Sequence, residues 1–206
     1  MVYFLLFFRK KIWFRIAGIC GILVPICILS LIFLSINSYQ FFNWESNALS
    51  DLGVVPGSTA TFFNHGLIGC GLLILLFIPG LYLFLDNKFN RIALPFFILA
   101  CCFLMAIGLF PENVRPIHYF VSVGFFFFLP ISLFLISGSF YFNKQSFWGF
   151  FTLIIAIEVT LPWVLTFFTD VFKALAIPEF LSGLGAAFWI FTLGLKMLFI
   201  SAKDKN

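Results

Sequence analysis

The two histidines of this 206-residue sequence are the first residues that could do chemistry, because each begins a long apolar run. His65 follows Asn64 at the start of one run, and His118 begins another after a short polar segment. Asp51 and Glu112 fall near the same ends of these runs. A histidine oriented by a carboxylate can exchange protons with an alcohol, an ester or a phosphate. The candidate catalytic residues are therefore Asp51, His65, Glu112 and His118, provided that the two histidine-bearing segments approach each other.

The same histidines allow two other interpretations. Zinc is bound by histidine nitrogens and carboxylate oxygens, so His65, His118 and Asp51 form a candidate metal site with zinc as its expected ion. The sequence has neither the HxxH nor the HExxH spacing that marks many such sites. Alternatively, each histidine is an interfacial side chain that only hydrogen-bonds a neighbour, a common role of polar residues in membrane proteins. The spacing leaves all three interpretations open.

Ser50 stands beside Asp51 and is a candidate nucleophile. A serine can attack an acyl carbonyl when a histidine takes its proton and a carboxylate orients that histidine. The alternative is local turn chemistry, because Ser and Asp shortly before Gly53 often hydrogen-bond the backbone around them. Arg115 could hold a phosphate through two parallel hydrogen bonds. Together with Asn64, it is a candidate for binding the polar part of a substrate.

Glu158 falls in the middle of an apolar run, shortly before Pro162. An ionised carboxylate at that depth is costly, so the side chain is expected to face other helices and to be protonated or paired. It is a candidate for substrate binding or for relaying protons. The alternative is a structural hydrogen bond that holds two helices together.

Membrane-spanning helices must position these residues. Hydrophobic residues make up 63% of the chain and charged residues only 10%, whereas about a quarter of a soluble domain is charged. Backbone groups in lipid must be hydrogen-bonded internally, and the apolar runs are too long for barrel strands. We predict an all-α, polytopic six-helix bundle in a single transmembrane domain, residues 1–206. Its helices are expected at residues 12–36, 62–85, 92–110, 117–142, 147–168 and 180–200.

Charge is distributed unevenly between the two ends of these helices. Six spans place both termini on one side, and ten of the twelve lysines and arginines fall on that side, leaving Arg115 and Lys173 on the other. The positive-inside rule therefore predicts that both termini are cytoplasmic. The opposite, outer side carries most of the acidic residues, namely Glu45, Asp51, Glu112, Asp170 and Glu179.

These features predict a multi-pass protein of the cell membrane. The basic residues flank apolar runs and do not form a soluble basic face, so we expect membrane lipids and no nucleic acid as partners. The long connection at residues 37–61 is predicted on the outer side, with one helical turn at residues 48–52 that Gly53 ends. The sequence predicts no oligomeric state.

Three segments carry a resemblance to a known family: NALSDLG at residues 47–53, FNHGL at 63–67, and GLFP at 108–111 followed by His118. With them the chain resembles, over nearly its whole length, the prokaryotic membrane family catalogued as domain of unknown function 998. That resemblance implies a six-helix topology and no particular reaction.

Two further similarities concern lipids. The SDLG element followed by Pro56 is similar to a loop of the Frag1/DRAM/Sfk1 family, part of which is linked to remodelling of lipid anchors. A similarity to the superfamily of alkaline ceramidases and progestin-receptor-like proteins would imply a zinc hydrolase with a Ser/Asp/His set. The sequence departs from that pattern because it contains no HxxxH pair.

Two classes of function are consistent with the sequence. The first is a hydrolase or transferase that acts on a lipid or lipid-linked substrate at the outer leaflet. The second is a non-enzymatic membrane carrier or structural protein, in which the same outer residues hydrogen-bond the loops together.

Overall fold

A computed structural model of the protein describes residues 2–85 and 87–203. Within these residues there is no strand, and six helices are long and apolar enough to cross a membrane. The prediction of an all-α bundle with six transmembrane helices is thus confirmed. The elements in chain order are α1 (Val2–Asn37), the short 3₁₀ helix η1 (Leu49–Val54), α2 (Ser58–Leu85), α3 (Asn90–Leu109), α4 (Ile117–Phe142), α5 (Ser146–Phe168) and α6 (Ala176–Lys203).

Several helices are longer than the apolar runs that predicted them. The backbone of α1 is helical from Val2, since neither glycine nor proline separates its first residues from the apolar run. α6 begins at Ala176 and includes Pro178 in its first turn, where the missing N–H of a proline leaves no hydrogen bond unmade. α2 begins directly after Gly57, whose φ of 93° is a conformation that glycine adopts readily.

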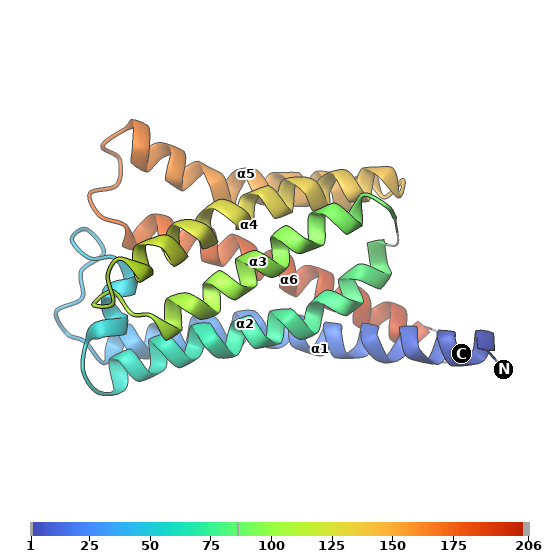
Figure 1. The fold of residues 1–206 in the computed structure, drawn as a ribbon, viewed down its shortest axis with the longest axis horizontal. Helices are drawn as coiled ribbons and strands as arrows, with labels where there is room; N and C mark the ends of the chain where they lie inside the picture. Colours follow the sequence, from blue (N-terminus) through green and yellow to red (C-terminus); the bar gives the residue numbers. More distant parts are fainter. Residues whose placement is uncertain (1, 86, 204–206) are drawn as a thin grey trace.

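The helices form a closed ring. Each packs against the next along the chain, and α6 packs against α1. Figure 1 shows α3 between α2 and α4, with the start of α1 and the end of α6 at the end of the bundle opposite η1. A Cβ atom on Gly21 would lie 2.8 Å from the Cα of Gly194. These glycines therefore let the backbones of α1 and α6 touch, which closes the ring.

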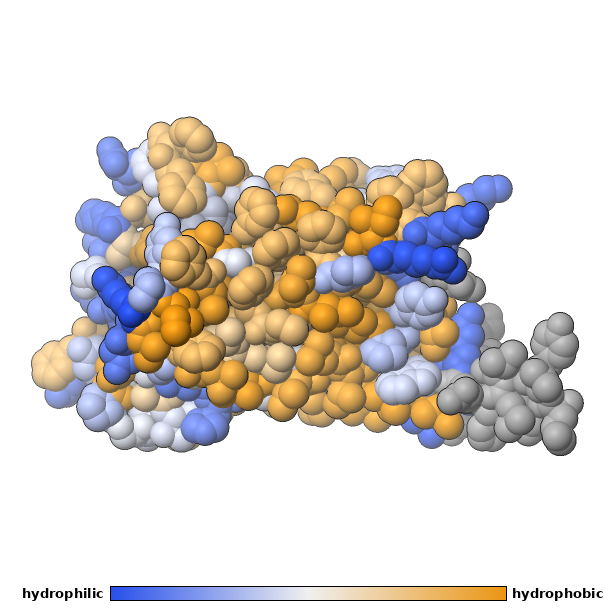
Figure 2. All heavy atoms as spheres, in the orientation of Figure 1, coloured by the Kyte–Doolittle hydropathy of each residue, from blue (hydrophilic) through white to orange (hydrophobic). Residues whose placement is uncertain are grey.

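The surface of the bundle separates into an apolar band and two polar ends (Figure 2). Phe127, Phe150 and Phe188 are each more than half exposed. Soluble proteins rarely expose apolar surface on this scale, whereas lipid chains solvate it. The chain is therefore a multi-pass membrane protein.

One end of the bundle, here called the η1 end, is covered by the α1–α2 connection. The predicted helical turn is present there as η1, and it continues through Gly53 to Val54 instead of ending at the glycine. A Cβ on Gly53 would lie 2.7 Å from Oδ1 of Asn64, so a larger residue there would have to displace the Asn64 amide. Asn64 also donates from Nδ2 to the Gly53 carbonyl at 2.9 Å. The connection is thus seated directly on α2.

Candidate functional site

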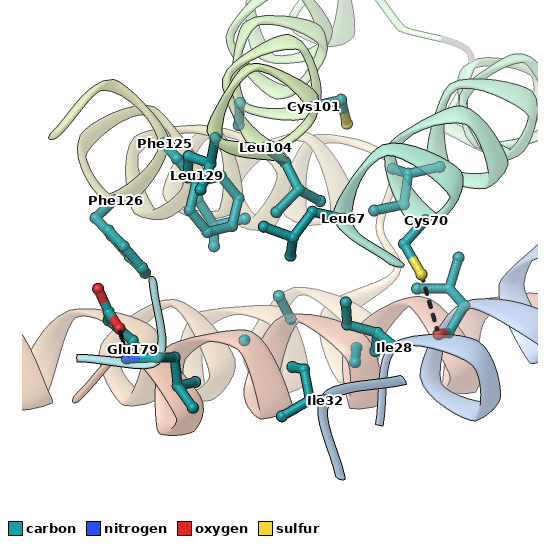
Figure 3. A pocket seen from close by; sticks show the side chains of 18 of the residues that line it. Ile28, Ile32, Leu67, Cys70, Cys101, Leu104, Phe125, Phe126, Leu129 and Glu179 are labelled. Atoms are coloured by element: carbon teal, nitrogen blue, oxygen red, sulfur yellow. Dashed lines mark hydrogen bonds between the residues drawn. The ribbon is translucent and has the colours of Figure 1, made fainter. Parts of the chain in front are cut away.

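The ring of helices encloses an apolar cavity of about 100 Å³ in the half of the bundle next to η1. Phe63 and Ile74, which both line it, are separated by about 16 Å along α2 at a rise of about 1.5 Å per residue. Figure 3 shows Leu67 and Leu104 near the middle of the view, with Glu179 at its left end. The lining comes from η1 and from every helix except α5 within the described residues.

Aromatic packing closes the cavity on the side of the chain termini. The Trp189 side chain is fully buried, and its ring meets the cavity-lining Phe97 edge-on with centroids 5.6 Å apart. Trp189 also donates from Nε1 to Oγ1 of Thr152 at 2.9 Å, which ties α6 to α5. The hollow is therefore confined to the half of the ring near η1.

Polar groups close the cavity at the η1 end. Among the described residues that line it, the side chains that carry oxygen are Ser50, Ser122 and Glu179. Oε2 of Glu179 accepts a hydrogen bond from the Leu49 backbone N–H at 2.6 Å, and the carboxylate also accepts from the Ser50 N–H. The Ala176 N–H donates to the Asn47 carbonyl at 3.0 Å. The first turn of α6 thus holds η1 over the cavity.

Next to this roof, Asp51 and Glu112 form a carboxyl pair that joins η1 to the α3–α4 connection. Their side chains lie within hydrogen-bonding reach of each other. Asp51 also accepts from Asn47 Nδ2 at 2.8 Å and from the Ala48 N–H at 3.0 Å. Arg115 makes an ion pair with Oε1 of Glu112. Three of the predicted site residues are therefore brought together.

Two carboxylates can only accept, so their contact needs a proton on one of them. The hydrogen bond with Asp51, followed by burial, raises the pKa of Glu112 above its ordinary value. Burial alone would raise the pKa of Asp51, but the hydrogen bonds from Glu112, Asn47 and Ala48 lower it overall. When the pair holds one proton, Glu112 is therefore the group that carries it, and Asp51 is the carboxylate.

His118 is buried at the start of α4, where its ring is held on both sides. Nδ1 lies 2.8 Å from the Phe110 carbonyl oxygen, and Nε2 lies 3.3 Å from the Ser122 hydroxyl. Ser122 is part of the cavity wall. The histidine is therefore linked to the cavity through a serine one helical turn away on the same helix.

His65 does not join this group. Its side chain is exposed on α2, and Nδ1 contacts the carbonyl of Thr61 on the same helix at 3.0 Å. α3 lies between α2 and α4 in the ring, so the helices that carry the two histidines are not neighbours. Over residues 2–85 and 87–203, no three or more His, Cys, Asp or Glu side chains lie where they could hold one metal ion. The geometry thus gives the zinc hypothesis no support.

Glu158 also lies away from the cavity. Its carboxylate occupies the space that a Cβ on Gly185 of α6 would fill, between α5 and α6. Its Oε2 is buried and makes no hydrogen bond with the described residues. The residue is at a helix contact and does not line the cavity.

Comparison with known proteins gives one match. The model of a family described as a protein of unknown function, DUF998, matches residues 7–196. The chain belongs to the DUF998 family. The resemblance of the sequence to domain of unknown function 998 is therefore confirmed. No curated protein and no solved structure matches it.

Two residues of this DUF998 member reach the cavity although the sequence did not single them out as site residues. In the sequence, Glu179 is one of several acidic residues on the predicted outer side. Its hydrogen bond to Leu49 joins residues that are 130 positions apart, so no local pattern could reveal it. Ser122 had a local signal, since it follows His118 by four residues and such pairs share one face of a helix. Whether that face lines a cavity is decided by the neighbouring helices.

Proposed function

We propose that this protein binds a lipid or lipid-linked molecule and acts on it as a hydrolase or transferase at the outer leaflet. The apolar tail occupies the cavity, and the polar part lies beneath η1. The observation that carries the proposal is the polarity of the cavity. Its lining is apolar along α1, α2 and α3, whereas Ser50, Ser122 and Glu179 gather at the η1 end.

The balance of interactions favours an amphiphile over a purely apolar ligand. A tail that moves from the bilayer into an apolar cavity leaves one hydrocarbon environment for another, so it gains little from the hydrophobic effect. Selectivity must then come from packing and from the polar end. There the ligand meets the backbone and side chain of Ser50 and the carboxylate of Glu179.

The neighbouring Asp51–Glu112 pair offers acid–base chemistry. Glu112 can give a proton to a leaving group, and Asp51 can accept one from an alcohol or from water. Arg115 is exposed beside the pair and can contact a phosphate of the head group. The positive-inside rule, applied to the charges in the sequence, places this end outside the cytoplasmic membrane and both termini inside.

A carrier or structural protein is the second candidate, because several site residues also brace the fold. Asp51 bonds Asn47 and the Ala48 backbone, while Glu179 bonds the backbone of η1. In this alternative a lipid fills the cavity without being changed. Lipid binding with no turnover by protein in liposomes would favour it.

Filling the cavity tests the proposal. Gly183 lines the cavity, and a Cβ placed there would meet no atom within 4 Å. A leucine at this position therefore extends into the cavity without a backbone clash. Gly69 has the same open space but does not line the cavity, so Gly69→Leu is the matched control.

Native mass spectrometry of protein purified in mild detergent measures the retained lipid. We expect wild type and Gly69→Leu to retain a lipid, and folded Gly183→Leu to lose it. Equal lipid retention by all three proteins would contradict binding in the cavity.

A further inference from the structure

The contacts of His118 decide which of its nitrogens carries the proton. The Phe110 carbonyl oxygen can only accept, so the contact of 2.8 Å at Nδ1 assigns the hydrogen to that nitrogen. In the neutral imidazole Nε2 is then unprotonated and can only accept. Its partner at 3.3 Å is the Ser122 hydroxyl, which must donate. A serine whose proton points at an imidazole is the arrangement of an activated nucleophile.

The position of Ser122 places this pair at the wall of the cavity. Ser122, Phe125, Phe126 and Leu129 all line the cavity, and their spacing places them on one face of α4. His118 lies one turn closer to the η1 end on the same helix. An acyl chain lying along Phe125 and Leu129 would therefore bring its carboxyl end to the Ser122 hydroxyl.

Ser50, the nucleophile considered from the sequence, has no such base. It lies in the same cavity, but both histidine rings are engaged elsewhere, His65 with Thr61 and His118 with Phe110 and Ser122. The contact between Glu179 and Ser50 is made to the backbone N–H and leaves its hydroxyl unactivated.

We infer that Ser122 is the nucleophile and His118 the general base of an acyl-transfer reaction on a lipid ester. This inference rests on the proposed function and names its substrate class. The Ser122 oxygen forms a bond to the ester carbonyl carbon while its proton moves to Nε2 of His118. The bond from that carbon to the alcohol oxygen breaks, and the alcohol leaves with the proton from His118.

An acyl-serine and a free alcohol result from this first half. Water then attacks the acyl-serine, again giving a proton to Nε2, and this proton returns to Ser122 as the carboxylic acid is released. If a second alcohol attacks in place of water, the product is a new ester. Neither half needs a metal or a redox partner.

A fluorophosphonate with a long alkyl chain is the test reagent, because it reacts with activated serines and its chain suits the cavity. Full-length protein in mild detergent is treated with it, and peptide mass spectrometry locates the modified residue. We expect modification at Ser122, none there in Ser122→Ala, and labelling at least about 100-fold slower in His118→Ala, as expected for loss of a general base. Ser46, exposed in the α1–α2 connection, gives the control variant Ser46→Ala, which should label at the wild-type rate.

Three results would overturn the inference: modification at Ser50, no modification of the wild type, or unchanged labelling in His118→Ala. Site mapping on the wild type decides between the first two even if Ser122→Ala does not fold. The lipid retention of Gly183→Leu is measured separately. Loss of lipid in that variant without labelling of Ser122 in the wild type would leave the proposed function standing and refute only the nucleophile.

Discussion

Replacing Glu179 by alanine should release η1 from the rest of the bundle. The carboxylate accepts hydrogen bonds from the backbone N–H groups of Leu49, at 2.6 Å, and Ser50. Leu49 and Ser50 are both buried. Glu179→Ala therefore removes the acceptor of two buried donors at once, whereas Glu179→Gln keeps one acceptor oxygen.

The size of the effect follows from those two donors. A buried N–H without an acceptor costs roughly 1–3 kcal/mol, so two of them cost roughly 2–6 kcal/mol. Water that enters at the η1 end hydrogen-bonds these N–H groups in part. We therefore expect the free energy that holds η1 closed to fall by about 2–3 kcal/mol. At about 1.4 kcal/mol per factor of ten, local opening becomes about 30- to 150-fold more frequent.

Hydrogen exchange followed by mass spectrometry measures this opening directly. Peptides that cover residues 47–54 should exchange faster by that factor in Glu179→Ala and by a smaller factor in Glu179→Gln. Peptides from α5 should exchange as in wild type, because that helix does not contact η1 strongly. Unchanged protection of residues 47–54 in folded Glu179→Ala would refute the reasoning, since it would mean that other contacts hold η1.

Two further predictions concern charge and topology. The raised pKa of Glu112 means that the folded protein holds this proton more tightly than the unfolded chain does, so thermal stability should fall as pH rises from the ordinary range of a glutamate through the raised pKa. Glu112→Gln keeps a donor toward Asp51 without titrating, so its melting temperature should vary less over that range. An equally steep fall in the variant would show that other groups cause it. A reporter active only outside the cytoplasmic membrane should work when inserted near Val55 and fail when fused after Asn206. Activity of the C-terminal fusion would reverse the orientation and place the η1 end in the cytoplasm.

The helical architecture was predictable because it depends on local composition. Long apolar runs must form helices in lipid, since every backbone group needs a partner within its own segment. The ends of helices were less predictable where the end of an apolar run is not marked by a glycine or proline that stops the helix. α6, for example, begins at Ala176, before the apolar run at residue 180, because a helix tolerates Pro178 in its first turn.

Part of the candidate site was also visible in the sequence. Asp51, Glu112 and Arg115 were expected at one end of the bundle, and the structure places them in contact. His65 has the same depth by sequence but projects from an exposed position on α2. Sequence spacing gives the depth of a residue along its helix, whereas the side of the helix that faces inward depends on which neighbours pack against it.

Composition and residue order were thus enough to predict the spans, the uneven distribution of charge, and the depth at which polar residues gather. Helix packing was needed to show that α6 closes a ring with α1, that the ring leaves an apolar cavity, and that Glu179 hydrogen-bonds η1 at the end of this cavity. Transmembrane helices all carry apolar side chains on their surfaces, so hydropathy cannot specify which helices pack against each other. Close contacts such as the one between Gly21 and Gly194, and hydrogen bonds between distant segments, specify them instead.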